Sequence, residues 1–322
     1  MIRLFDKAEY DFLSKWRITF AISALFTIPG LVLLGIRGLN SSIEFTGGTA
    51  IQVHALDENI RTAELRAALS AAGIEGAEIQ TFGAQDEFMI RARLDPRVEV
   101  DEESTQRTQA AVRQALTDAF GEDAFEIDAG RSVGPKVGSE LRERTIMALL
   151  MAFGAIFIVI WFRYEWRFSL AAVLATVHDI LATVAFISFI NLEVSLVVVA
   201  ALLTIVGYSL NDTIVTFDRV RENLKKYKRS NISEILNRSI NETLPRTVLT
   251  SGTTLAAVLA LLILGGPIIR PFAWVMTFGV ITGTYSSIFI ASPILLRVEQ
   301  RWPGEDVRGA RTIQTRGEPA AT

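Results

Sequence analysis

The chain alternates between long apolar runs and shorter polar segments, and the apolar runs dominate its second half. A run of roughly 18 or more apolar residues is long enough to cross the hydrocarbon core of a bilayer as a helix. Six runs have this length, at residues 18–36, 145–162, 168–190, 194–217, 247–264 and 272–296. The pattern predicts a polytopic α-helical membrane protein, and a hydrophobic content of 50% agrees with it.

The long polar segment between the first two runs, residues 37–144, has the pattern of a small folded domain. Alternating or β-rich stretches predict strands, and stretches of helical period predict helices. In chain order these are strand 49–54, helix 62–72, strand 77–82, strand 87–92, helix 102–120 and strand 124–127. The order predicts a ferredoxin-like α+β domain.

Glycines flank this predicted domain on both sides. Gly47 and Gly48 lie at its start, and Gly134 and Gly138 lie at its end. Glycine permits backbone conformations that other residues resist, so these positions are candidate hinges between the domain and the membrane helices. The alternative interpretation is that both segments are plain turns.

Lysine and arginine predict the orientation of the chain, because short cytoplasmic segments are enriched in them. They gather at residues 1–17, 163–167, 218–246 and 297–322. The turn 191–193 carries none, and the last turn carries only Arg270. We therefore expect both termini in the cytoplasm and an extracytoplasmic domain at 37–144, with a five-helix bundle at 145–296. The first run is too long for a signal peptide and lacks an A-x-A-like site, which indicates an uncleaved anchor.

The basic segment 218–246 interleaves charged residues with apolar ones. Ser233 is placed to cap a short helix whose apolar stripe lies against the membrane face. Such a segment is typical of a positively charged anchor, and a docking surface for a cytoplasmic partner is the alternative.

Charged and amide residues lie inside or at the edge of the apolar runs. Asp179 lies in the third, Asn211 and Asp212 lie together in the fourth, and Arg246 begins the fifth. A charge at membrane depth costs about 2.5–3.5 kcal/mol on insertion scales, so such residues usually face a bundle interior and act on ions or protons. Burial favours the neutral acid and a nearby guanidinium favours the carboxylate, so Asp212 and Arg246, together with Asn211 and Asp179, are candidates for a proton pathway. A structural ion pair that holds two helices together is the alternative.

Small and hydroxylated residues predict close contacts between the membrane helices. Gly207 lies one turn before Asn211, where it would permit a close helix approach. The sixth run carries Gly279 and Gly283 in a GxxxG spacing, for which packing is the expected role.

Several classes of activity are excluded by the residues themselves. The chain has no cysteine and two histidines, so we expect no disulfide, no metal site and no cofactor. It has no P-loop and no nucleophile elbow, so ATP chemistry would belong to a partner. The basic loop has a membrane explanation and does not indicate nucleic-acid binding.

Five motifs together resemble the SecF family of protein-export membrane subunits. They are IEFTGGT at 43–49, VGPKVG at 133–138, GYSLNDTIV at 207–215, FDRVREN at 217–223, and Arg246-Thr247 followed by TSGTT at 250–254. The resemblance runs from the first apolar run to about residue 296. One departure is visible, because Glu44 stands where the family usually has aspartate in its D-F-T-G-G motif.

The resemblance implies a bacterial inner-membrane subunit related to RND transporters. Such a subunit pairs with SecD, often with YajC, and assists the SecYEG channel and the SecA ATPase by using proton flow to pull an unfolded exported polypeptide outward. It implies proton-pathway roles for the residues matching Asp212 and Arg246, and no ATPase of its own. Two other functions remain: an RND-type exporter of small amphiphiles or lipids, and a passive scaffold of the translocon.

Overall fold

The computed structural model describes residues 9–56, 60–74, 77–81, 86–92, 102–127, 131–133, 135–228, 230–266 and 268–303. Within these residues, six helices are long and apolar enough to cross a membrane, which confirms the number expected from the sequence. They are α1 (Trp16–Arg37, preceded by the short turn Leu13–Lys15), α5 (Pro135–Arg163), α6 (Trp166–Phe189), α7 (Leu196–Lys226), α8 (Ile232–Leu264), and α9 (Arg270–Ser286) with its continuation.

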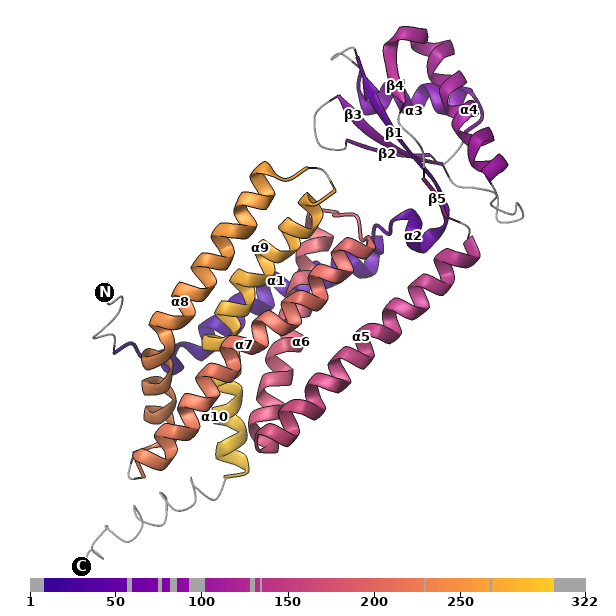
Figure 1. The fold of residues 1–322 in the computed structure, drawn as a ribbon. Helices are drawn as coiled ribbons and strands as arrows, with labels where there is room; N and C mark the ends of the chain where they lie inside the picture. The colour runs from indigo at the N-terminus through magenta and orange to yellow at the C-terminus, as the bar shows by residue number, and fades with distance from the viewer. Residues whose placement is uncertain are drawn as a thin grey trace, which may run out of the picture.

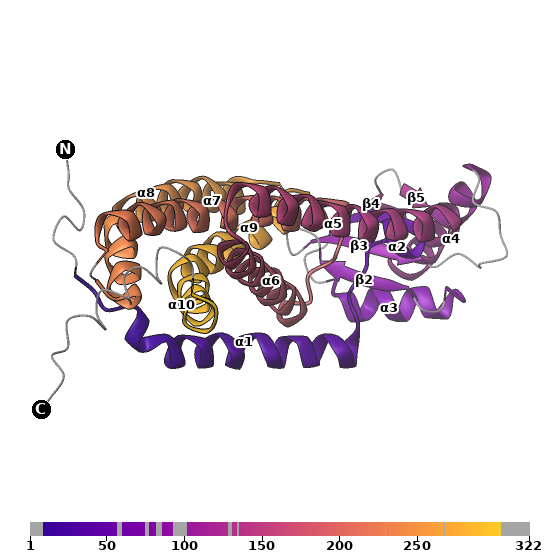
Figure 2. The ribbon, with the colours of Figure 1, turned by 90° about the horizontal axis from the view of Figure 1, so that it is seen from below.

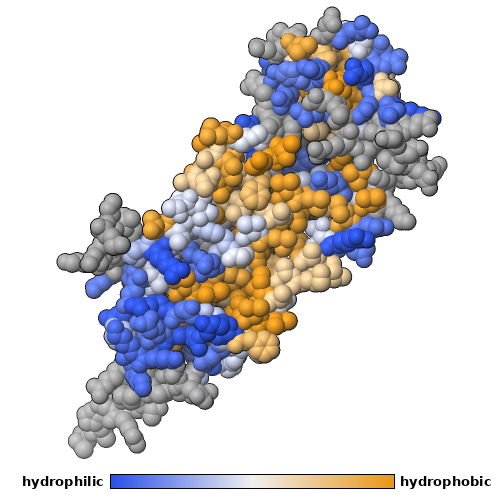
Figure 3. Space-filling view, in the orientation of Figure 1, coloured by the Kyte–Doolittle hydropathy of each residue, from blue (hydrophilic) through white to orange (hydrophobic). Residues whose placement is uncertain are grey.

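Helices α6, α7 and α9 form the inside of the bundle, where about half or more of each apolar segment is buried. Helices α1, α5 and α8 lie outside them and bury far less of their surface. Figure 2 shows α6 between α1 on one side and the α7–α8 layer on the other. On the face of the bundle seen in Figure 3, an apolar band covers the helices, and hydrophilic residues gather at the end that lies far from the strands. We call this the far end.

The sixth span is interrupted near its middle. A π-helical turn, Ser287–Ala291, follows α9, and α10 (Ser292–Arg301) continues the helix to the far end. Such turns usually insert one residue into an α-helix and often occur at functional sites. Here the turn follows directly after Ser286, which points into the bundle interior.

Helices α7 and α8 extend well beyond the apolar runs that predicted them. The short membrane-surface helix expected around Ser233 is instead the first part of α8, which continues through Pro245. Its cap is Asn231, whose side chain accepts a hydrogen bond from the Ser233 amide at 3.3 Å. The apolar residues of this segment pack against the end of α7 and not against a membrane surface, because Leu224 shares a buried cluster with Ile235.

The polar segment folds as an α+β domain beyond the other end of the bundle (Figure 1). Its elements are β1 (Gly48–Ala55), α3 (Thr62–Ala71), β2 (Glu78–Thr81), β3 (Glu87–Ala92), α4 (Glu102–Phe120) and β4 (Phe125–Ile127). The strand order β2-β3-β1-β4, antiparallel throughout, confirms the ferredoxin-like prediction. Its core lies between the sheet and the two helices, with Ile51, Phe88, Leu65 and Leu116 fully buried. We call it the sheet domain.

Two short elements connect the sheet domain to the bundle, and the sequence pattern did not predict either. Helix α2 (Ile43–Thr46) joins α1 to β1, and β5 (Arg131–Val133) pairs antiparallel with β1 before the chain enters α5. The pairing places the segment that enters the domain, β1, beside the segment that leaves it, β5.

The candidate hinge glycines lie at this junction. Gly47 has φ 74° and Gly48 has φ 135°, which are left-handed values that favour glycine. Gly138 is helical, and a Cβ added to it would lie 2.9 Å from the Gly47 nitrogen. The two glycine segments therefore touch and form one joint; Gly134 lies outside the described residues. A hinge function for this joint stays a prediction.

Candidate functional site

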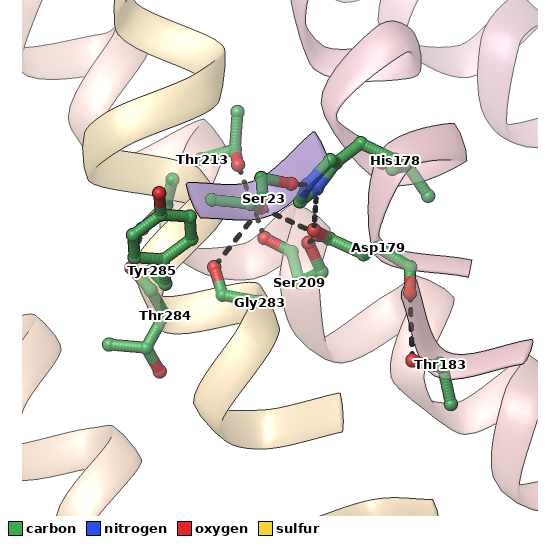
Figure 4. A network of polar contacts seen from close by, with 12 residues as sticks. Ser23, His178, Asp179, Thr183, Ser209, Thr213, Gly283, Thr284 and Tyr285 are labelled. Carbon is green, nitrogen blue, oxygen red and sulfur yellow. Dashed lines mark hydrogen bonds and ion pairs between the residues drawn. The ribbon is translucent and has the colours of Figure 1, made fainter. Parts of the chain in front are cut away.

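Asp179 is the centre of a buried polar network inside the bundle. Its side chain is 0% exposed and lies on α6. One carboxylate oxygen accepts hydrogen bonds from the Ser209 hydroxyl of α7 and from the Ser286 hydroxyl of α9, the latter at 2.6 Å. The other contacts Nδ1 of His178 at 2.9 Å. Figure 4 shows the His178 and Ser209 side chains pointing towards the Asp179 carboxylate.

The network continues to α1 through His178. Its Nε2 contacts the Ser23 hydroxyl, so the imidazole bridges α1 and the Asp179 carboxylate. A second link lies nearby, where the Tyr285 hydroxyl donates to the Thr19 carbonyl at 2.7 Å. Helices α1, α6, α7 and α9 are thus joined at one level by polar contacts, which is how a bundle retains a charge-bearing residue in its interior.

Asp212 lies on α7, on the side that faces α8. It is 3% exposed. One carboxylate oxygen accepts a hydrogen bond of 3.3 Å from the Ser251 hydroxyl of α8, and Ser251 in turn accepts one of 2.7 Å from the Thr284 hydroxyl of α9. Ser209 precedes Asp212 by one turn of α7, so a donor to Asp179 and the second aspartate lie on successive turns of the same helix.

The two buried aspartates therefore differ in how well they are satisfied. Asp179 has two hydroxyl donors and an imidazole, whereas Asp212 has a single long hydrogen bond among the described residues. When few hydrogen-bond donors surround a buried carboxylate, its ionised form is poorly stabilised, and protonation breaks few hydrogen bonds. The surroundings of Asp179 therefore stabilise an ionised carboxylate more than those of Asp212 do, and a proton-pathway role for either residue stays a prediction.

Arg246 follows Pro245 on α8 and is exposed in the isolated chain. Its charge interacts electrostatically with Asp212. Neither Asp212 nor any other described residue pairs with it within 4.0 Å. The geometry thus places a positive field near Asp212 without an ion pair between them.

Asn211 lies on a different face of α7 from Asp212. It is exposed, and its side chain makes no hydrogen bond to another described residue. The structure therefore does not bring Asn211 into contact with Asp212 or Asp179, and its proposed part in a proton pathway stays a prediction.

Small residues create the close contact between α7 and α9. A Cβ added to Gly279 would overlap the Ile205 side chain, and one added to Gly283 would lie 3.1 Å from the Ser209 Cβ. The packing role expected of the GxxxG spacing is confirmed. The same expectation for Gly207 is wrong within this chain, because no described atom lies within 4 Å of a Cβ added there.

An exposed polar face runs along α7 and α8 at the level of the apolar runs. Its residues are exposed in the isolated chain although they lie in membrane-length helices. They are Thr204, Gly207 and Asn211 on α7, and Arg246, Gly252 and Thr253 on α8. We call this set the polar face. Side chains of this kind seldom contact lipid directly.

Sequence reasoning missed the hydroxyl partners of the two carboxylates. Ser209, Ser251, Ser286 and Thr284 are each buried or partly buried and each hydrogen-bonds within the site. Hydroxylated positions at helical spacing were visible in the sequence, but which carboxylate each would reach depends on helix rotation, which the sequence does not encode locally.

The far end holds a polar cavity of about 680 Å³ between the N-terminal segment and α8. Tyr10, Asp11, Arg219, Asn237 and Glu242 are among its lining residues. The hydrogen bonds that the carboxylate accepts, first from the Ser14 backbone and then from Asn237, hold the pKa of Asp11 below its usual value. Nowhere in the described part of the chain do three or more His, Asp or Glu side chains gather as metal ligands would.

At the adjoining α5–α6 turn, burial raises the pKa of Tyr164 to about 12, and its hydrogen bond to Asp218 of α7 acts in the same direction. The phenol therefore stays protonated and links this turn to Asp218 in the last third of α7.

Comparison with known proteins assigns the chain to a family. Residues 112–301 match the model of the C-terminal part of the protein export membrane proteins SecD and SecF. The chain is 50% identical over 325 residues to the protein translocase subunit SecF of Gemmatimonas aurantiaca, covering 100% of this chain and 97% of that protein. It is 40% identical over 296 residues to the SecF subunit of Rickettsia akari, covering 92% and 94%.

Solved structures agree with this assignment. The crystal structure of SecDF, a translocon-associated membrane protein from Thermus thermophilus, matches with a TM-score of 0.82 and 36% identity over 94% of this chain. A second structure, SecDF in a super-membrane-facing form, matches with a TM-score of 0.66 and 35% identity. The chain spans 40% of the length of each of these SecDF chains. By sequence, by fold and by the motifs around Asp212 and Arg246, the chain belongs to the SecF branch of the SecD/SecF family of protein-export membrane proteins.

Proposed function

We propose that this multi-pass inner-membrane protein is an auxiliary subunit of the Sec translocase, and that proton exchange at Asp212 drives its working movement. In this mechanism the carboxyl group takes up a proton from one side of the membrane and releases it to the other. Each change of charge alters how α7 packs against α8 and α9, and the rearrangement is passed to the sheet domain, which acts on the exported polypeptide.

The observation that carries the proposal is the setting of Asp212. Its carboxylate is 3% exposed and, within the described part of the chain, accepts one hydrogen bond of 3.3 Å and lies in the field of an arginine that does not pair with it. Burial favours the neutral acid and the guanidinium favours the carboxylate, so a helix movement that changes either effect shifts the protonation equilibrium of Asp212. One charge that crosses 100 mV is worth about 2.3 kcal/mol, so a few protons per cycle supply the energy of a rigid-body movement.

The orientation that we propose places the far end in the cytoplasm and the sheet domain in the periplasm. The far end carries Lys15, Arg17, Arg163 and Arg297 where the helices leave the apolar band. Trp16 lies beneath two of these cations, 5.4 Å from Arg17 and 4.1 Å from Arg297. Aromatic rings with basic neighbours are typical of a cytoplasmic membrane interface.

The polar face supports the proposal that a partner with membrane helices of its own binds this chain. Arg246, Asn211 and Thr204 would be costly against lipid and become tolerable when another subunit covers them. This chain spans 40% of each solved SecDF chain, so the rest of those chains leaves room for a second set of membrane helices. We propose a SecD-like subunit at this face, with YajC, SecYEG and SecA as further members of the assembly; ATP hydrolysis belongs to SecA and not to this chain.

The alternatives have less support. A scaffold that uses Asp212 and Arg246 as a structural pair predicts a direct contact, and the two side chains interact only at a distance. An exporter of amphiphiles predicts an apolar chamber, whereas the far-end cavity is lined mainly by charged and amide side chains.

The test is proton-driven export in vesicles that contain the whole translocase. We expect Asp212→Asn to abolish the part of export that depends on the proton gradient and to leave the ATP-driven part in place. Asp118→Asn, at an exposed acid of α4 in the sheet domain, is the matched control and should export normally.

A charge exchange separates the relay from the scaffold. Asp212→Arg combined with Arg246→Asp restores function if the residues are only a pair, and leaves it lost if Asp212 carries protons. Unchanged proton dependence in Asp212→Asn would refute the relay.

A further inference from the structure

The first turn of α7 is capped by a residue from another part of the chain. Its own N-cap residue, Ser195, makes no capping hydrogen bond. The first helical amide, that of Leu196, instead donates to Oε2 of Glu44 at 2.7 Å, across 152 positions of sequence. The N-terminus of a helix leaves amide donors unpaired and carries partial positive charge, so a carboxylate there is a strong cap.

Glu44 lies in α2, the short helix at the base of the sheet domain. The Ser42 hydroxyl donates to the same carboxylate oxygen at 3.3 Å, which orients the side chain towards α7. The cap therefore joins the base of the sheet domain to the helix that carries Asp212.

Further contacts fasten the same two parts. The Val194 amide donates to the Asn40 carbonyl at 2.7 Å, and the Ser42 amide donates to the Val194 carbonyl at 3.0 Å. Arg91 of β3 forms an ion pair with Glu193 of the α6–α7 turn. The turn before α7 is thus bound both to the stem of the sheet domain and to its sheet.

Packing on the other side limits how α2 can move. Gly138 of α5 lies so close that a Cβ there would be 3.2 Å from the Phe45 carbonyl carbon. Helix α2 is therefore held between the start of α5 and the start of α7. As long as these contacts hold, the sheet domain and the start of α7 therefore move together.

We propose that Glu44 is a positioning residue that couples α7 to the sheet domain. Asp212 lies 16 residues beyond Leu196, about 24 Å along a continuous helix. A shift or tilt of α7 at Asp212 therefore reaches the Glu44 carboxylate, and through it the domain. This coupling rests on the proposed function for its driving force. The contact between the Glu44 carboxylate and the first turn of α7, which we call the tether, can be measured without that function.

The tether is tested in the full-length chain in lipid nanodiscs. The chain has no cysteine, so Ser70→Cys on α3 and Lys225→Cys at the far end of α7, both exposed, accept one spin label each. We expect Glu44→Gln to broaden the distance distribution between these labels. We also expect amide exchange at residues 196–199 to rise by at least about fivefold, because the charge-assisted hydrogen bond is lost.

Two control variants separate the tether from general effects of capping. Ser195→Ala removes the hydroxyl that stands at the N-cap position without capping. Glu64→Gln removes a carboxylate that caps α3 within the sheet domain by accepting from the Arg61 amide at 3.2 Å. Both should leave the label distances and the exchange of residues 196–199 as in the wild type. Wild-type distances and exchange in Glu44→Gln would overturn the proposal.

Export in translocase vesicles then connects the tether to function. We expect Glu44→Gln to reduce proton-driven export several-fold and Glu44→Asp, which keeps the charge, to retain at least half. Impaired export with undisturbed distances, or equal loss in the Asp and Gln variants, would refute coupling through the carboxylate. Failure of the proposed function is a separate result, read from Asp212→Asn alone.

Discussion

Two buried aspartates on neighbouring helices have opposite environments. Asp179 receives hydrogen bonds from α7, from α9 and from its neighbouring histidine, so removing it leaves several donors without an acceptor. Asp212 receives one long hydrogen bond from Ser251. The first arrangement stabilises one packing of the bundle, and the second provides few contacts that the proposed change of charge at Asp212 would break.

This contrast predicts different costs for the same substitution. We expect Asp179→Ala to lower the free energy of unfolding by roughly 2–4 kcal/mol, since each buried donor left unpaired costs about 1–3 kcal/mol. We expect Asp212→Ala to cost about 1 kcal/mol. Thermal unfolding of the purified variants in detergent measures the difference, and equal losses would contradict it.

The hydrogen bonds of Asp11 predict that the N-terminal segment becomes less stable in acid. Its carboxylate accepts hydrogen bonds from the Ser14 amide at 3.1 Å and from Asn237 of α8 at 2.8 Å, which lower its pKa. Because the folded pKa lies below the ordinary value of 3.8, the stabilisation is complete above pH 3.8 and is lost as the pH falls through the folded pKa.

We therefore expect amide exchange of residues 10–15 to accelerate below about pH 4, after correction for the intrinsic rate. Asp11→Asn should remove this transition. Persistence of the transition in that variant would assign it to another group.

At the scale of the element, α7 and α9 approach each other through small residues. Gly279 contacts the Ile205 side chain and Gly283 contacts Ser209, one of the donors to Asp179. The close approach is thus a condition for the polar network, because larger side chains would separate the hydroxyl groups from the carboxylate.

The packing predicts that Gly279→Ala destabilises the bundle by about 1–3 kcal/mol, the usual cost of overpacking. Gly154→Ala in α5 is the control, because no described atom lies within 4 Å of a Cβ added there and alanine favours a helix. The two variants should differ in unfolding temperature in detergent, and a stable Gly279→Ala would contradict this account.

The sequence pattern predicted the elements well and their ends less well. The strand at 87–92 and the helix at 102–120 agree with the structure, since alternation and helical period are local properties. The ends of α7 and α8 were missed because charged residues such as Arg219 and Glu242 look like a solvated loop. In the structure these two residues pair at 2.6 Å and continue the helix hairpin.

For the whole molecule, the sequence predicted which residues carry charge in the bundle but not how they meet. The hydroxyl donors to Asp179 and the cap that Glu44 provides depend on contacts across 30 to 152 positions. Periodicity contains no information on such distances. Gly47 and Gly138 were both expected as hinge positions, but the contact between them was missed for the same reason.

The overall topology can be tested directly because the natural chain has no cysteine. We expect Ser70→Cys in the sheet domain to react with a membrane-impermeant maleimide in intact spheroplasts, and Lys225→Cys at the far end to react only after the membrane is opened. The opposite pattern would reverse the orientation and remove the periplasmic role of the sheet domain.

The polar face has a consequence for the life of the protein in the cell. A copy made without its partner subunit would expose Arg246 and Asn211 to the hydrocarbon of the bilayer. Exposure of such groups to hydrocarbon is energetically unfavourable. Copies without a partner would have a shorter lifetime in the membrane, because membrane proteases would degrade them faster. The amount of this subunit would then follow the supply of the other, so that stoichiometry is enforced by degradation and needs no matching of synthesis rates.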